Sequence, residues 1–233
     1  MNIRTSFILF SIQIYAITAS AAIIDVPGTA NIFGAGHTLA PEPGGGGGGT
    51  LPPGFLLPLG TGRSLTVSSV TGTITNSNGS QVIDPDGVIF SSTITSFGGI
   101  SGFTSPRGLA LVGVFLSDVE PADPAPASID FNSIGIAFTI LSPSIAQIFF
   151  IGDGKTGTGG GLLQTFQVPN GATRVFFGVA DALGAAGPPG TFSDNGGTFT
   201  ANATVTPEPT AVALAFCGAI ALFPRRNRND RNG

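Results

Sequence analysis

The sequence predicts an all-β protein whose body, residues 22–205, forms an antiparallel β-sandwich of jelly-roll topology. Three observations lead to this fold class. The body holds eight or nine short apolar or alternating segments, turn residues such as Gly, Pro, Asn and Asp recur between them, and no segment has the spacing of a convincing helix. A body of this length corresponds to about one domain and can bury a core of its own.

The predicted strands are short and are separated by turns. They span residues 23–33, 65–74, 88–94, 108–116, 134–140, 145–151, 163–168, 174–180 and 199–205. The run at 108–116 is almost continuously apolar, which is typical of a central strand. The last segment alternates between Phe, Ala or Val at one position and Thr or Asn at the next, as a half-buried strand does.

Local signals predict how the strands are joined. The apolar positions of the second strand change phase between Val67 and Val70, which predicts a β-bulge. Asn78-Gly79 predicts a hairpin turn, and Asp84-Pro-Asp-Gly87 predicts another turn. Residues 38–62 contain six consecutive glycines and several prolines, a composition that predicts a flexible surface loop.

The first 21 residues have the pattern of a secretory signal peptide. A short start with a single Arg precedes an apolar run at residues 6–18, and Ala19-Ser20-Ala21 is a small-residue cleavage site. We expect cleavage just before Ala22. The sequence therefore predicts an exported protein.

The chain ends in a three-part tail, residues 206–228. Pro207, Glu208 and Pro209 form an extended elbow, because each proline fixes its own φ and restricts the residue before it. Residues 211–223 form an uncharged apolar helix, which is shorter than the roughly 20 residues of a full span but can insert as a marginal one. The basic cluster that follows stays on the cytoplasmic side and consists of Arg225, Arg226 and Arg228. The alternative is a buried C-terminal helix.

This order of Pro-Glu-Pro, short apolar helix and terminal arginines resembles the bacterial PEP-CTERM sorting tail. The resemblance covers about the last 25 residues. It implies handling by an exosortase, a membrane enzyme that recognises the tail near Pro-Glu-Pro. It also implies transient anchoring in the inner membrane, followed by a destination at the cell surface or in the exopolysaccharide matrix.

The charge of the body favours cations as partners. The body holds four basic and eleven acidic residues, a formal net charge of −7. Phosphate contacts need Lys and Arg, so a nucleic-acid partner is not expected. The only cysteine, Cys217, lies in the tail, so the body has no disulfide, and a bound divalent ion is a plausible source of stability.

One segment of the body combines several oxygen ligands. A strand delivers Asp181 to its end, a Gly- and Pro-rich loop turns the chain back, and Asp194-Asn195 precedes the last strand. Calcium takes six to eight oxygen ligands from carboxylates, amides and carbonyls, so these residues can form a calcium site. The alternative is an ordinary hairpin loop, in which Asp, Asn and Gly are common.

The order Asp181, Pro189-Gly190-Thr191-Phe192, Asp194-Asn195 resembles the C-terminal half of the small calcium-dependent galactose-binding lectins of bacteria, which are β-sandwiches. The resemblance implies a galactose-binding-like fold and an ion that chelates two sugar hydroxyls. The implied calcium ligands are Asp181, the carbonyl of Thr191, Asp194 and Asn195, with a weaker match at a backbone carbonyl near Asn76. The loop is lengthened here by residues 182–188.

Catalytic motifs are not found in the body, and we expect no enzyme. A single His, no body Cys and no serine elbow disfavour a nucleophilic hydrolase. Glu42 and Glu120 lie in Pro-rich loops, which are poor positions for a glycosidase acid. Gly154-Lys155-Thr156 lacks the first Gly of a phosphate-binding loop, since that position is Phe149.

Together these features predict an exported surface or matrix protein that binds calcium and carbohydrate, with extracellular polysaccharide as a partner. The alternative is a structural surface or matrix protein with no small-molecule ligand. It is suggested by the aromatic content of the body, which is limited to Phe.

Overall fold

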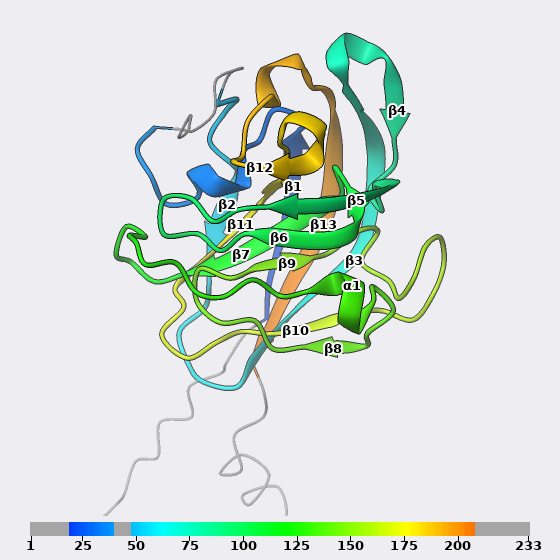
Figure 1. Ribbon diagram of the computed structural model, residues 1–233. Helices are drawn as coiled ribbons and strands as arrows, with labels where there is room; N and C mark the ends of the chain where they lie inside the picture. The colour runs from blue at the N-terminus through cyan, green and yellow to red at the C-terminus, as the bar shows by residue number, and fades with distance from the viewer. Residues whose placement is uncertain (1–18, 40–47, 208–233) are drawn as a thin grey trace, which may run out of the picture.

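The computed structural model describes residues 19–39 and 48–207, and this part of the chain is all-β (Figure 1). In chain order its elements are β1 (Ser20–Pro27), β2 (Gly54–Leu56), β3 (Arg63–Asn76), β4 (Gln81–Ile83), β5 (Val88–Ile94), β6 (Phe103–Gly108), β7 (Leu111–Leu116), α1 (Phe131–Ile134), β8 (Ile140–Leu141), β9 (Ile148–Phe150), β10 (Thr165–Gln167), β11 (Arg174–Val179), β12 (Ala186–Gly187) and β13 (Gly196–Pro207). The predicted all-β class is confirmed.

The strands of the described residues form three sheets. The largest has the order β1-β13-β3-β10-β8. β4 pairs with the C-terminal end of β3, whereas β10 pairs with the N-terminal end of β3. The second has the order β2-β11-β7-β9, and the third has the order β12-β5-β6. Most pairs are antiparallel, but β10 pairs with β8 and β12 pairs with β5 in parallel.

The longest pairing joins β3 to β13 and also positions one end of the site described below. Alternation along β13 buries Phe199, Ala201, Ala203 and Val205, while the intervening Thr and Asn side chains face outward. The register shifts where Asn202 faces Ser69 and Ala203 faces Val67, so one residue of β3 is left over. The bulge predicted between Val67 and Val70 is therefore confirmed.

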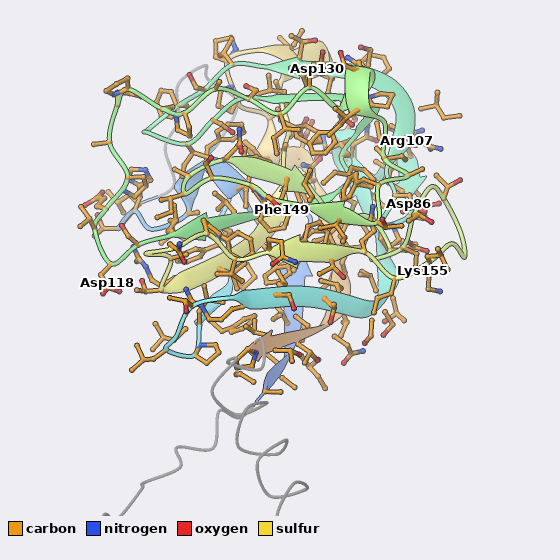
Figure 2. All side chains as sticks on the ribbon, turned by 90° about the horizontal axis from the view of Figure 1, so that it is seen from below. Asp86, Arg107, Asp118, Asp130, Phe149 and Lys155 are labelled. Atoms are coloured by element: carbon orange, nitrogen blue, oxygen red, sulfur yellow. The ribbon has the colours of Figure 1, made fainter. Side chains whose placement is uncertain are left out.

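A cluster of phenylalanine rings joins the two larger sheets. The ring of Phe149 in β9 lies 4.8 Å from that of Phe166 in β10 and 4.9 Å from that of Phe115 in β7, measured between centroids. Figure 2 shows Phe149 near the middle of the molecule. Gly113 of β7 leaves room for this ring, because a Cβ there would lie 2.7 Å from its tip. Burial of each such side chain stabilises the fold by about 1.5–3 kcal/mol.

The strand predicted at residues 134–140 is wrong. Asp130 caps the short helix α1 by accepting a hydrogen bond from the amide of Asn132 at 3.0 Å, and Gly135, with φ of 75°, ends it. Only Ile140 and Leu141 at the end of this stretch are extended, as β8. The helix cap and the glycine outweighed the spacing of the isoleucines.

The segment predicted as a flexible loop, 38–62, contributes a strand. β2 pairs with β11 at the edge of the second sheet, and Leu57 is buried. Nδ2 of the Asn31 side chain donates to the carbonyl of Gly48 at 2.9 Å, and this bond holds the segment at Gly48.

The predicted signal peptide and sorting tail lie largely outside the described residues. Ser20 and Ala21, which precede the expected cleavage point, pair with Val205 and Thr204 at the start of β1. Pro207 is the last described residue and pairs with Arg63 at the end of β13. Within residues 19–39 and 48–207, no helix has the length and apolar character needed to cross a bilayer.

Candidate metal site

The predicted ligands come from two different sheets. β11 of the second sheet ends at Val179, two residues before Asp181. Asn195 immediately precedes β13 of the largest sheet. The intervening loop runs through β12, which pairs with β5, and ends in a short helical turn, Phe192–Asp194, whose buried Phe192 anchors it.

Asp181 is the most buried carboxylate of this group, with 8% of its surface exposed. Its Oδ1 accepts a hydrogen bond from the amide of Ala182 at 2.8 Å, and its Oδ2 accepts one from Nδ2 of Asn195 at 2.8 Å. Burial raises the pKa of Asp181 to about 6, with a contribution from the nearby charge of Asp194, although the bonds from Asn195 and Ala182 oppose the shift.

Two further oxygen atoms at the site are buried and have no donor among the described residues. They are Oδ1 of Asp194 and Oδ1 of Asn195. The Asn195 residue as a whole is 6% exposed, and its Nδ2 is already used on Asp181 and, at 3.3 Å, on the carbonyl of Gly28. Buried acceptors normally find a donor, so acceptors left unpaired beside a buried carboxylate suit a cation.

Four of the five predicted residues line one pocket. A cavity of about 280 Å³ is lined by Asn76, Asp181, Thr191 and Asp194, together with residues of β4, β5 and the 182–185 turn. Asn195 lies next to it through its bond to Asp181. None of the described residues lining the cavity is basic, so the two carboxylates there face no protein cation.

The backbone carbonyls of the site differ in how strongly they are engaged. Thr191 has a left-handed φ of 64°, and its carbonyl accepts only a long bond, 3.4 Å, from the amide of Asp194. The carbonyl of Asn76 accepts from the amide of Ser80 at 3.0 Å and from its hydroxyl at 3.3 Å. The Thr191 carbonyl is therefore the more available ligand, and Asn76 lines the pocket with its carbonyl already in use.

The ligand set is one of mixed oxygens. No cluster of three or more His, Cys, Asp and Glu side chains occurs in the described parts of the chain. This pocket has two carboxylates, and its other oxygens belong to amides, hydroxyls and carbonyls. Such a set suits calcium, whereas sites for zinc are built from Cys and His.

Three further residues of the pocket were not predicted from the sequence to belong to the site. Phe90 of β5 and Leu183 of the 182–185 turn line the same cavity, although they are 51% and 82% exposed. Gln81 of β4 lines it as well. No sequence signal marks these residues, because their place depends on how the third sheet meets the largest one.

Of the predicted sorting residues only Pro207 is described, at the end of β13. Glu208, Pro209, Arg225, Arg226 and Arg228 lie outside the described residues, as does the predicted helix 211–223.

Comparisons with family models, with curated proteins and with solved structures returned no match to this chain.

Proposed function

We propose that the protein is an exported, non-enzymatic β-sandwich of the cell surface or exopolysaccharide matrix that binds calcium and, through it, carbohydrate. The two larger sheets, which meet through Phe149 and Phe166, support the sandwich. The terminal Pro-Glu-Pro segment, apolar run and arginines support sorting by an exosortase after transient anchoring in the inner membrane.

One observation supports the calcium site above the others. Asp181 and Asp194 line a single pocket, Asn195 is bonded to Asp181 beside it, and Oδ1 of both Asp194 and Asn195 is buried without a donor among the described residues. The two carboxylates share a pocket in which no basic side chain of the described lining neutralises them.

The residues that would hold the ion are Asp181, Asp194 and Asn195 through their side chains and Thr191 through its carbonyl. Carboxylate oxygens that already accept one hydrogen bond keep a second lone pair for a metal. Calcium prefers a high oxygen coordination number, so the bound ion would supply positions for two hydroxyls of a sugar.

No catalytic role is proposed for Asp181. Both of its carboxylate oxygens accept hydrogen bonds, from Ala182 and Asn195, and their remaining lone pairs are assigned to the ion.

Thermal denaturation tests the calcium proposal. Calcium at a hundredfold excess over its Kd should stabilise the purified protein by about 2.7 kcal/mol relative to EDTA. For a protein of this size each kcal/mol raises Tm by about 2–4 °C. Identical melting curves in calcium and in EDTA would remove the ion site from the proposal.

A deletion tests the sorting proposal. A chain lacking residues 207–228 should be exported but should fail to reach the surface or matrix location of the intact chain. Fractionation and immunoblotting measure the location and maturation of the two chains. If both are equal, the sorting proposal is contradicted.

The second candidate is a structural surface or matrix protein with no small-molecule ligand. It is favoured by the pairing of Asp181 with Ala182 and Asn195, which closes the loop without an ion. Calcium-dependent retention of the protein on a glycan array would eliminate this candidate.

A further inference from the structure

The pocket combines polar and apolar lining. Asp181 and Asp194 supply carboxylates, while Phe90 and Leu183 supply exposed apolar surface. Large apolar side chains that are exposed and also line a cavity with convergent polar groups are typical of a ligand-binding surface.

The exposure of Phe90 has a definite structural cause. Alternation along β5 would place it on the same face as Ser92, which is fully buried. However, Ile89 pairs with Arg107 and Ser92 pairs with Ser105, so two residues of β5 face the single residue Pro106 of β6. This β-bulge turns the ring of Phe90 out of the alternating pattern and toward the cavity, as bulges beside binding sites do.

The strand next to Phe90 leaves the cavity open. Gly108 also lines the pocket, and a Cβ added there would lie 3.8 Å from Cβ of Phe90. A larger residue at Gly108 would crowd Oγ of Ser92, 3.2 Å from that Cβ, as well as Phe90, and would take up space at the pocket wall.

We propose that Phe90 is the stacking platform of this pocket and that its ligand is one neutral pyranose ring. This inference rests on the calcium and carbohydrate function proposed above and names the residue that selects the sugar. A pyranose is amphipathic: its C–H face can lie on an aromatic ring while its hydroxyls bind polar groups.

The volume and the charge of the pocket further restrict the class of sugar that it can bind. A cavity of about 280 Å³ is slightly below the roughly 300–1,000 Å³ of drug-sized sites, so it suits one sugar residue of a longer polymer. Asp181 and Asp194 already balance the charge of a bound calcium ion, and no basic side chain among the described lining residues can pair with the anionic group of a uronate or a sulfated sugar, so a neutral sugar is favoured. The amide of Gln81, which lines the same pocket, can bind a hydroxyl of a neutral sugar.

The test compares Phe90→Ala with a matched control. Ile89→Ala removes the neighbouring side chain of β5, which is 84% exposed but does not line the pocket. Calorimetric titrations measure calcium alone, and then methyl galactopyranoside, glucopyranoside and mannopyranoside and galacturonate with calcium present. Phe90→Tyr, which keeps the ring, serves as the rescue variant.

We expect Phe90→Ala to weaken binding of the preferred methyl hexopyranoside about tenfold, while its calcium titration matches that of the wild type. Ile89→Ala and Phe90→Tyr should bind the sugar as the wild type does. Three outcomes would each overturn the inference and leave the calcium proposal standing. They are unchanged sugar binding by Phe90→Ala, a loss of calcium binding by the same variant, and a preference of the wild type for galacturonate. A wild-type protein that takes up no calcium would overturn the proposed function itself, and this inference with it.

Discussion

Nδ2 of Asn195 donates a hydrogen bond of 2.8 Å to Oδ2 of Asp181, and this bond joins the end of a strand in one sheet to the start of a strand in another. The same amide reaches the carbonyl of Gly28, just after β1, at 3.3 Å. One buried side chain thus connects three segments that are distant in sequence.

Replacement of Asn195 by Ala should destabilise the protein by about 1–3 kcal/mol, because a buried carboxylate oxygen loses its donor. Urea unfolding measures the loss. Asn202→Ala is the control: its Nδ2 donates to Ser69 at 2.8 Å on the outer, partly exposed face of the largest sheet, where the loss should be smaller. Equal losses for the two variants would count against a special role for Asn195.

Asp181→Asn should abolish the calcium-dependent rise in Tm, because the substitution removes the charge of the most buried carboxylate at the site. Differential scanning calorimetry in calcium and in EDTA measures this rise. Asp118→Asn changes an exposed acid that accepts a bond from Thr173 at 2.6 Å and does not line the pocket, so it should keep the full rise. A full calcium effect in Asp181→Asn would exclude this residue as a ligand.

Stability without calcium should depend on pH through Asp181. Its pKa of about 6 in the folded protein exceeds the roughly 3.9 of an unfolded chain. Between these values the folded form holds a proton that the unfolded form has released. The contribution of Asp181 to the free energy of unfolding is therefore fully present below about pH 4 and is lost as pH rises through about 6. The loss is on the order of 2–3 kcal/mol.

The measurement is the pH dependence of Tm in EDTA for the wild type and for Asp181→Asn. Burial also raises the pKa of Asp86, so only the difference between the two proteins isolates Asp181. That difference should vary between pH 4 and 6, and parallel profiles would refute the assignment. Calcium competes with the proton, so its stabilising effect should increase above about pH 6.

Gly154→Ala should destabilise the fold far more than Gly157→Ala. Both glycines have positive φ, 86° and 78°, so both substitutions incur a similar backbone cost. A Cβ at Gly154 would overlap the backbone carbonyl of Val67, whereas nothing lies within 4 Å of a Cβ at Gly157. The additional cost should be about 1–3 kcal/mol or more by urea unfolding, and similar values for both variants would contradict it.

The sequence predicted the structure correctly where its local patterns agree with the packing of the strands. Alternation at residues 199–205 identified β13, and the change of phase after Val67 identified the bulge opposite it. The meeting of Asp181 with Asp194 and Asn195 was also predictable, because all three flank strands whose ends are joined by one loop.

The sequence did not predict the structure where the edge of a sheet or a helix cap determines it. β6 contains Pro106, which argues against a strand, but β6 is the edge of its sheet and the bulge leaves Pro106 without a paired partner. At residues 134–140 the spacing of isoleucines suggested a strand, although Asp130 and Gly135 set a helical turn there. Phe90 reaches the pocket only because of a bulge between two strands, which no local pattern encodes.

β13 separates the pocket from the point where the described chain ends. It begins at Gly196, directly after Asn195, and its twelve residues end at Pro207. At about 3.3 Å per residue this strand extends about 40 Å, and Figure 1 shows it running lengthwise through the molecule. A support that grips the chain beyond Pro207 would therefore be remote from the cavity, whose entrance would be turned outward and within reach of long polymers in the surrounding medium.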